Sequence, residues 1–534
     1  MPLLKKKLIK LLNYSFLFIE FIQINILNKK KKIFIDLFSL FKSKSLELNK
    51  DGIILVEMVE NFEFAFKIAS ASYTLANKYN YKVSIYDCNW NTRLNKPNFQ
   101  KWLNCFGLHS IIQKVYLAFG DQIIFSNSNL YYNQNLIHHK SDQIFASLIK
   151  TSDILDIKFD GVIVGDLIYD TYLRYYHEPT ITKLDQRLKF IIRVSLDIYY
   201  SFCDLLDSQP IKVLIQSYTS YITHGICSRI ALHKGLKVYC ISSDAYIIQE
   251  AKLDFPYHGI NHTKFLPEND ISTDKLHIAE SLLTKRFEGG IDEATSYMKQ
   301  SSFFQSNKFE SLKLLFNKQN RNIVIYAHDF YDSPHINRLL QFDDLFKFLD
   351  ETLFFLNNLS DVSVFIKIHP NGILGADDIT IKLVQKYNNN NFYILDANVS
   401  NLDIIKLKPD IIGTARGTVG IEMSYFEIPV VALFDNIYCN YNFVHTCKSV
   451  IEYFNILSGN SNYKIDYNKK NIYNFYYKAY LEQKELDTEN VLNKIKVKEH
   501  DTYTVGYIVE FLKRNDNKIV EELINLYQKA ISLN

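Results

Sequence analysis

Two blocks in which apolar strands alternate with helices constrain the fold of this chain more than any other feature. In the first block, the apolar strand GIILVEMV (residues 52–59) precedes a helical stretch, NFEFAFKIASASYTLANKYN, and a second strand, KVSIYD (residues 82–87). Further apolar strands are expected at residues 161–166, 211–217 and 236–242, with helical stretches between them. Such alternation predicts a mostly parallel sheet with helices on both faces, as in doubly wound α/β proteins.

The second block repeats the alternation, with expected strands at residues 322–328, 363–369, 391–396, 410–414 and 429–434. A chain of 534 residues is too long for one core. We therefore predict an α/β fold of the GT-B type: two Rossmann-like doubly wound domains facing a central cleft, with helical N- and C-terminal extensions. The expected parts are an N-terminal basic, amphipathic segment, the two Rossmann-like domains and a C-terminal helical extension, at residues 1–48, 49–315, 316–465 and 466–534.

The charge balance argues against a nucleic-acid partner. Lys and Arg number 61 and Asp and Glu 58, a net charge of +3, whereas nucleic-acid-binding domains are strongly basic.

The 7 cysteines show no spacing suited to zinc, and an odd, unpatterned set fits a reducing compartment. We therefore expect a cytoplasmic protein with no metal site and no disulfide framework.

The N-terminal segment has lysines at residues 5–7 and 29–32 on either side of an apolar stretch. No small-residue cleavage site follows, which argues against a signal peptide. Four polar residues argue against a transmembrane helix: Asn13, Glu20, Gln23 and Asn25. Two interpretations stay open, an amphipathic helix in peripheral contact with the inner face of the cytoplasmic membrane and an ordinary packed helix with solvated lysines.

Polar residues follow three expected strands of the second block, in HDFYDSPH (residues 328–335), KIHPNG (residues 367–372) and GTARGT (residues 413–418). The carboxyl ends of parallel strands meet at one edge of a sheet, where ligands bind in open α/β folds. We therefore expect these segments to form one crevice. Its candidate donor-binding residues are His328, His335, Lys367, His369, Arg416, Gly417, Thr418 and Glu422.

These residue types suit the phosphate groups of a nucleotide. A helix that begins near Thr418 offers free N–H groups, and Gly417 and Gly420 leave room for phosphate oxygens. The cationic side chains add charge-assisted hydrogen bonds. Glu422 stands four positions after Thr418, one beyond the capping-box position. Its carboxylate is expected to accept hydrogen bonds from ribose hydroxyls or, alternatively, to compensate the helix dipole.

Four segments of the second block resemble a known group of proteins: HDFYDSPH, FDDLFKFLDETL (residues 342–353), KIHPNG and RGTVGIEMSYFEIPVV. In this order they resemble the C-terminal half of bacterial capsule and surface-polysaccharide biosynthesis proteins. Those proteins are GT-B glycosyltransferases related to capsular Kdo transferases and, more distantly, to wall-teichoic glycerophosphotransferases. They share a K-x-HP strand end and a T-x-G-x-E helix start. In the first block, residues 164–176 and 224–239 also resemble this group.

The resemblance implies a glycosyltransferase that moves a sugar from a nucleotide-activated donor to a growing capsular or lipopolysaccharide-type glycan. The first domain would receive a glycan or lipid-linked glycan acceptor. The second would hold the donor nucleotide through His369, Thr418 and Glu422. The nucleotide sugar is then a co-substrate, and no cofactor is expected. Arg416 beside Gly417 departs from the Kdo-transferase pattern and leaves the donor open.

An inverting transfer needs a base that takes the proton of the acceptor hydroxyl. Candidates are Asp166 and Asp170 at strand ends of the first domain and His224 in the helix opening TSYITHG, and Asp166 is favoured because it directly follows the apolar GVIV. Arg174 lies one helical turn after Asp170, so a local ion pair is the structural alternative. No DxD metal motif is evident. The transfer is therefore expected to be metal-independent, with cationic side chains and a helix dipole in place of a metal.

Three other functions stay open at this point. A nucleotide-sugar 2-epimerase shares the two-domain architecture and the phosphate site, and it needs acidic residues on both sides of the bound sugar. A glycerophosphotransferase of GT-B architecture is closer in its chemistry. A non-catalytic nucleotide-sugar-binding assembly factor would keep the second-domain site and dispense with the first-domain cleft.

Overall fold

The computed structural model describes most of the chain between residues 35 and 532. The residues outside the description are 1–34, 37, 43–48, 60–61, 88–107, 127–132, 242–246, 260–265, 268–270, 296–297, 299–300, 307, 317–318, 337–340, 370–371, 373–374, 434–435, 483–517 and 533–534. The amphipathic N-terminal segment therefore lies almost wholly outside the described residues. Within the described part, no helix combines the length and the apolar character that crossing a bilayer requires.

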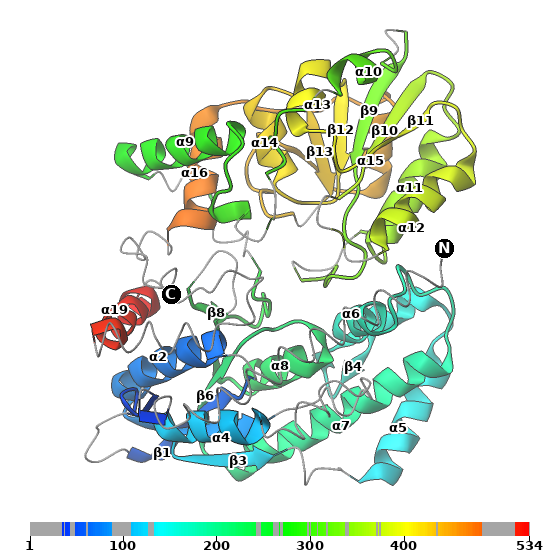
Figure 1. The fold of residues 1–534 in the computed structure, drawn as a ribbon. Helices are drawn as coiled ribbons and strands as arrows, with labels where there is room; N and C mark the ends of the chain where they lie inside the picture. The colour runs from blue at the N-terminus through cyan, green and yellow to red at the C-terminus, as the bar shows by residue number, and fades with distance from the viewer. Residues whose placement is uncertain are drawn as a thin grey trace.

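The first domain is built on a six-stranded sheet with the order β3-β2-β1-β6-β7-β8 (Figure 1). All neighbouring pairs are parallel except the edge pair of β7 and β8. The first strand, β1, lies at the centre, and the order in which strands are added to the sheet reverses between β1 and β6. This is the Rossmann strand order. The strands are β1 (Asn49–Glu57), β2 (Tyr81–Asp87), β3 (Gln122–Ser126), β6 (Ile211–Gln216), β7 (Lys237–Cys240) and β8 (Gln249–Ala251).

Helices cover both faces of this sheet. Ile54 and Val56 of β1 pack into one apolar core, and Ile53 and Leu55 pack into another on the opposite face, because successive side chains of a strand alternate. Burial on both faces explains why GIILVEMV is a nearly continuous apolar run. The helices are α2 (Phe62–Tyr79), α4 (Leu108–Phe119), α5 (Gln134–Ser147), α6 (Gly165–Tyr176), α7 (Gln186–Ser208) and α8 (Ile226–His233), with short turns η3 (Thr151–Asp156) and η4 (Tyr221–Gly225).

The second domain repeats the plan with an all-parallel six-stranded sheet, in the order β11-β10-β9-β12-β13-β14. This is the Rossmann order again, with the reversal between β9 and β12. The strands are β9 (Arg321–Tyr326), β10 (Val362–Lys367), β11 (Phe392–Leu395), β12 (Ile411–Thr414), β13 (Val430–Leu433) and β14 (His445–Cys447). Two sheets of this kind in one chain confirm the predicted fold class.

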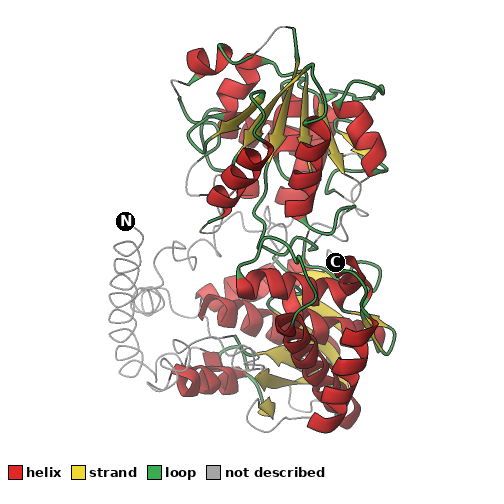
Figure 2. Cartoon of the chain, turned by 90° about the vertical axis from the view of Figure 1, so that its right-hand side faces the viewer, coloured by secondary structure: helices red, strands yellow, loops and turns green. Residues whose placement is uncertain are grey.

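Helices also cover both faces of the second sheet (Figure 2). One core contains residues of α11 (Leu345–Leu356), α12 (Ala376–Tyr387) and α15 (Val450–Leu457). The opposite core contains residues of α9 (Thr273–Phe287), α10 (Phe309–Lys313), α13 (Asn401–Leu407), α14 (Val419–Tyr425), α16 (Lys469–Tyr476) and the turn η7 (Tyr477–Leu481), and the turn η6 (Glu293–Thr295) adds Ala294.

The two described helices near the C-terminus belong to different domains. Helix α16 contacts α9 and α14 of the second domain. Helix α19 (Lys518–Ser532) instead packs on α2 of the first domain, where Leu523 and Tyr527 join the core (Figure 1). The chain therefore crosses back to the first domain before it ends.

One expected strand of the first block was wrong. Residues 161–166 do not add a strand to the parallel sheet; they form a small antiparallel hairpin, β4 (Lys158–Phe159) and β5 (Val162–Ile163), and then enter α6. At Gly165 a Cβ atom would lie 2.1 Å from the carbonyl oxygen of Ile154, so only glycine permits this close approach. Asp166 is therefore a first-turn residue of a helix instead of the end of a sheet strand.

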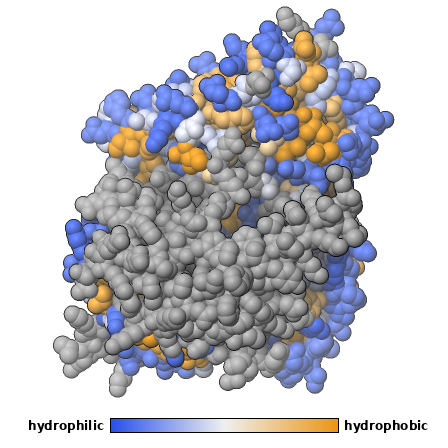
Figure 3. Space-filling model, viewed as in Figure 1, coloured by the Kyte–Doolittle hydropathy of each residue, from blue (hydrophilic) through white to orange (hydrophobic). Residues whose placement is uncertain are grey.

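The surface of the second domain is mixed in character. On the face seen in Figure 3, hydrophilic residues predominate and apolar residues form separate patches. Large exposed apolar side chains of this domain include Leu314, Phe354 and Ile451. Exposed apolar side chains are common on the surfaces of folded proteins.

Candidate donor pocket and catalytic residues

A pocket of about 330 Å³ lies at the carboxyl ends of the strands of the second sheet. Its walls come from the ends of β9, β10, β11 and β12, from the start of α14 and from the segment before α10. Seven of the eight predicted donor-binding residues line it: His328, Lys367, His369, Arg416, Gly417, Thr418 and Glu422. The ends of β9 and β12 flank the reversal of strand order, which is where ligands bind in open α/β sheets. His335 does not line this pocket.

The GTARGT loop connects β12 to α14, and its glycines have different tasks. Gly417 has a φ of 110°, a left-handed conformation that favours glycine, and it faces the pocket. Gly413 and Gly420 instead make room for neighbours, since a Cβ atom would lie 2.6 Å from Tyr453 Oη and 2.4 Å from Tyr438 Cζ, respectively. The expectation that Gly420 clears space for phosphate was therefore wrong, and Gly417 is the glycine that shapes the pocket.

Arg416 brings a positive charge into the pocket wall. Its Nη2 donates a long hydrogen bond of 3.4 Å to the carbonyl oxygen of Ser333. Its Nη1 is buried and finds no hydrogen-bond partner among the described residues. Burial lowers the pKa of the guanidinium, against the attraction of Asp170 and Asp332. An arginine stays charged in proteins, so this buried N–H group favours an anionic ligand.

Lys367 and the two histidines of the pocket are held in a dry environment. Lys367 Nζ donates to the carbonyl oxygen of Asp396 at 2.8 Å, and burial lowers the pKa of this lysine to about 8. Burial also lowers the pKa of His369 and His328 below its usual value. The His328 Nε2 atom accepts the backbone N–H of Ala415 at 3.2 Å, so His328 supports the GTARGT loop.

Glu422 lies in the pocket wall, and both oxygens of its carboxylate contact other residues of the second domain. One oxygen forms an ion pair with the buried Arg286 of α9, and the other accepts Nδ2 of Asn401 at 2.6 Å. Asn401 in turn accepts the hydroxyl of Tyr326 at 3.0 Å. Each carboxylate oxygen has a second lone pair, so these contacts orient Glu422 while a ribose contact stays a prediction.

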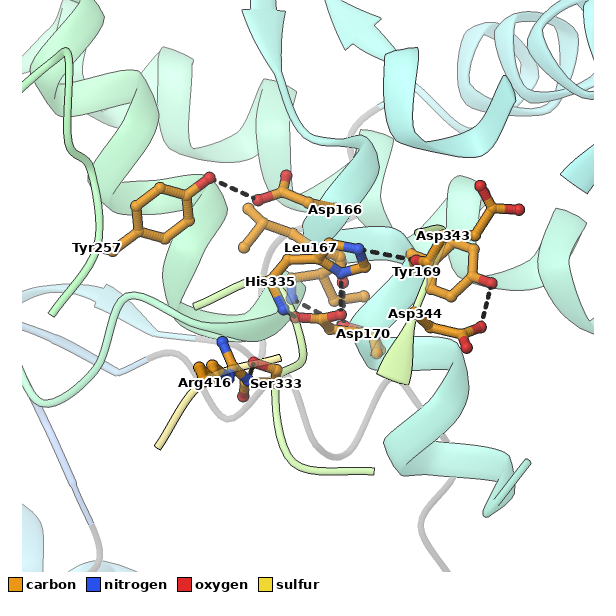
Figure 4. Close-up of polar contacts among 12 residues, drawn as sticks. Asp166, Leu167, Tyr169, Asp170, Tyr257, Ser333, His335, Asp343, Asp344 and Arg416 are labelled. Atoms are coloured by element: carbon orange, nitrogen blue, oxygen red, sulfur yellow. Dashed lines mark hydrogen bonds and ion pairs between the residues drawn. The ribbon is translucent and has the colours of Figure 1, made fainter. Parts of the chain in front are cut away.

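Asp166 and Asp170 are both buried in ion pairs. Asp166 accepts hydrogen bonds from Nη1 and Nη2 of Arg229 at 2.5 and 2.6 Å. It also accepts one from Tyr257 Oη at 3.2 Å (Figure 4). Burial would raise its pKa, but the charge and hydrogen bonds of Arg229 prevail and lower it. Asp170 contacts His335 of the second domain at 2.5 Å (Figure 4). Neither carboxylate lines the donor pocket, and the paired geometry favours a structural task for both.

The expected local ion pair between Arg174 and Asp170 does not form. Arg174 lies 4.0 Å from Asp332 of the second domain, in an exposed position. Asp170 turns to the buried His335 because it lies on the face of α6 that meets the second domain. Both partners are far away in sequence and could not be identified from helical spacing.

His224 has the geometry of a general base. Its Nδ1 lies 2.6 Å from Oε1 of Glu57, the last residue of β1. The other oxygen of Glu57 accepts the backbone N–H and hydroxyl of Ser217 at 2.7 and 2.6 Å. Burial would raise the pKa of Glu57, but its interactions with His224 and Ser217 lower it. An ionised Glu57 fixes the proton on Nδ1 and leaves Nε2 to accept one.

Glu57 was not among the residues expected from the sequence. A signal was present, because Glu57 is the polar residue at the carboxyl end of the strand GIILVEMV, the same position that identified Lys367 in the second block. Tyr218 packs beside this pair, with its ring centroid 5.7 Å from that of His224 and 5.4 Å from that of His258. His258 accepts the backbone N–H of Thr219 at 3.1 Å, and burial lowers its pKa to about 3.

The segment that follows β9 faces α6 and η4 of the first domain. Tyr221 Oη donates to Asp332 at 3.1 Å, and Tyr169 Oη donates to Asp344 at 2.6 Å. His224 and Tyr221 belong to the same turn, η4. The carboxyl edge of the second sheet therefore approaches the element that carries the candidate base.

Comparisons with known proteins give weak likenesses only. No protein-family model and no curated protein matches the chain. Among solved structures, the chain is similar to KpsC, a beta Kdo 2,4 transferase of Thermosulfurimonas dismutans, with 10% identity and a TM-score of 0.30 over 50% of this chain and 80% of the other. It is also similar to a glycosyltransferase from Rickettsia africae, with 11% identity and a TM-score of 0.26 over 84% of this chain and 100% of the other.

A third similar structure is a UDP-GlcNAc 2-epimerase from Neisseria meningitidis bound to UDP-GlcNAc, with 13% identity and a TM-score of 0.25. That alignment covers 83% of this chain and 100% of the other. Scores this low transfer no activity to the chain. The two Rossmann-like sheets described above are what establish the fold.

Proposed function

We propose that the chain is a glycosyltransferase that moves a sugar from a nucleotide-activated donor to a growing surface glycan of the capsular or lipopolysaccharide type. The observation that carries this proposal is the buried Arg416 Nη1 at the wall of a pocket between the ends of β9 and β12. A buried arginine N–H group with no hydrogen-bond partner among the described residues, at the switch point of a Rossmann sheet, suits a nucleoside diphosphate.

The pocket offers a group for each part of such a donor. Arg416 and Lys367 would hold the phosphate oxygens, with Gly417 leaving room for them. Glu422, oriented by Asn401 and Arg286, would accept the ribose hydroxyls. Met298 and Phe304 supply an apolar wall for the nucleobase. A volume of about 330 Å³ lies at the lower end of the range for small-molecule sites.

The first domain would supply the general base of the transfer. As the acceptor oxygen forms its bond to the anomeric carbon, the bond from that carbon to the diphosphate oxygen breaks. His224 Nε2 takes the acceptor proton, and Glu57 stabilises the imidazolium that results. Arg416 and Lys367 stabilise the charge that develops on the leaving diphosphate. Asp166 and Asp170 take no part in proton transfer in this account, because both are buried in ion pairs.

The acceptor would be a glycan or a lipid-linked glycan held by the first domain, while the pocket of the second domain holds the donor. The wall of that pocket includes Met298 and Phe304, which precede the expected domain boundary at residue 316. We place the protein in the cytoplasm, with the N-terminal segment, residues 1–48, as a candidate contact with the inner face of the membrane. The proposal includes no organic cofactor and no metal ion, since Arg416 and Lys367 take the charge-neutralising role.

A panel of UDP-, GDP- and CMP-sugars tests this proposal, with and without synthetic oligosaccharide acceptors, by mass spectrometry of nucleotide and glycan products. Nucleotide release that requires an acceptor, with a matching gain in acceptor mass, is the expected result. Conversion of the donor sugar without acceptor would identify an epimerase, and binding without turnover would identify a non-catalytic factor. The Arg416→Gln variant should weaken donor binding about tenfold, whereas His224→Asn should keep donor binding and lose at least about 100-fold in rate.

A further inference from the structure

Asp170 and His335 join the two domains through a buried ion pair next to the donor pocket. Asp170 lies on α6 of the first domain, and His335 lies in the segment that follows β9 of the second. The two residues are 165 positions apart, and both side chains are at most 4% exposed. Figure 4 shows this pair beside Arg416 and Ser333. The donor chemistry proposed above uses neither residue directly.

One carboxylate fixes both the side chain and the backbone of His335. Asp170 Oδ1 lies 2.5 Å from His335 Nδ1, and Oδ2 accepts the backbone N–H of His335 at 3.2 Å. On the far side of the ring, Nε2 lies 3.0 Å from the carbonyl oxygen of Asp343. A carbonyl only accepts, so Nε2 carries a proton, and the ring is held between two acceptors.

The same segment leads to Arg416 within two residues. Ser333 has a φ of 46°, a left-handed conformation that a serine adopts only where its surroundings impose it. Its carbonyl oxygen accepts Arg416 Nη2 at 3.4 Å. Just before it, Asp332 accepts the hydroxyl of Tyr221 at 3.1 Å. The first domain thus holds this segment on both sides of the carbonyl group that contacts the arginine.

The charges around the pair are balanced locally. Asp166 is satisfied by Arg229, and Asp344 accepts the hydroxyl of Tyr169. Both carboxylates raise the pKa of His335, as does Asp170, while burial opposes them. Asp170 also attracts the Arg416 guanidinium. The carboxylate therefore acts on Arg416 by charge as well as through the segment that it holds.

We propose that Asp170 and His335 are positioning residues of the donor site, which hold the Ser333 carbonyl so that Arg416 keeps one N–H group directed at the diphosphate. This inference rests on the proposed function, because the donor site is defined there. It gives the first domain an influence on donor affinity without any contact with the donor. Loss of the pair should therefore weaken donor binding and leave kcat unchanged.

Isothermal titration of the full-length protein with inorganic pyrophosphate tests the inference through a double-mutant cycle. Asp170→Asn should weaken binding about tenfold, as should Arg416→Gln, and the double variant should lose little more than either. Independent, multiplying losses would overturn the inference, and so would unchanged affinity in Asp170→Asn. With an active donor, Asp170→Asn should raise KM and leave kcat within about twofold.

Tyr169→Phe is the matched control, because it removes an interdomain hydrogen bond to Asp344 and keeps the ring that packs edge-on against His335. Its pyrophosphate affinity should equal that of the unmodified protein, and an equal loss would assign the effect to the interface in general. If Asp170→Asn does not fold, Tyr221→Phe removes the other hold on the segment, and unchanged affinity there overturns the inference. A folded, unmodified protein that binds no pyrophosphate would overturn the donor site and this inference together, whereas an effect of Arg416→Gln alone would overturn only the inference.

Discussion

Lys367 should take up a proton when the pocket binds a nucleoside diphosphate. The side chain is 5% exposed, and burial lowers its pKa to about 8. Folding therefore favours the neutral amine above that pH. A phosphate beside the amine favours the charged form and raises the pKa again. The expected effect of ligand binding is proton uptake, because the bound state holds more protons than the free state.

The magnitude follows from the fraction of neutral lysine before binding. With a pKa of about 8, roughly 10% of Lys367 is neutral at pH 7, about 50% at pH 8 and about 90% at pH 9. If the bound pKa exceeds about 10, binding takes up about 0.1, 0.5 and 0.9 protons at these three pH values. The terminal phosphate of a nucleotide has a second pKa of about 6 and contributes little at pH 8 and 9.

Isothermal titration with UDP and GDP in buffers of different ionisation enthalpy measures this uptake at each pH. Lys367→Met should abolish the rise between pH 7 and pH 9. Lys382→Met, which removes an exposed lysine of α12 outside the pocket, should retain it. Zero uptake at pH 9 in the unmodified protein, or undiminished uptake in Lys367→Met, would refute the reasoning.

Three further predictions concern the paired carboxylates. Glu57→Gln should lower the transfer rate at least about 100-fold in initial-rate assays at unchanged donor affinity, since His224 loses its charge partner, and a normal rate would remove Glu57 from the mechanism. Glu422→Ala should lower the free energy of unfolding in urea by about 3–5 kcal/mol, because it breaks the buried pair with Arg286, and unchanged stability would contradict that pairing. Asp166→Asn should lower the free energy of unfolding by a similar amount at neutral pH, because it breaks the buried pair with Arg229. The folded-state pKa of Asp166 is lowered, so this loss of stability should shrink as the pH falls below about 4. A pH-independent difference would count against the ion pair.

The fold and the location of the pocket could be predicted from the sequence because both depend on local patterns. Apolar strands that alternate with helices imply parallel sheets, and parallel sheets place their ligands at the carboxyl ends of the strands. The HDFYDSPH, KIHPNG and GTARGT segments follow three such strands, and His328, Lys367 and Arg416 line one pocket in the structure. Their binding of a nucleotide stays a prediction.

The partners of the charged residues could not be predicted, because they depend on how distant segments meet. Glu422 pairs with Arg286 across 136 residues, and Asp166 pairs with Arg229 across 63. Asp166 looked like a strand end because GVIV is apolar and β-branched, but Gly165 allows the chain to fold back on η3 and start a helix.

The most direct test of the central claim is a crystal structure of the protein with a bound nucleoside diphosphate. The account places the diphosphate in the pocket between the ends of β9 and β12, with a phosphate oxygen within about 3 Å of Arg416 Nη1 and the ribose next to Glu422. A diphosphate bound elsewhere, or bound in this pocket without a contact to Arg416, would contradict the proposed donor site.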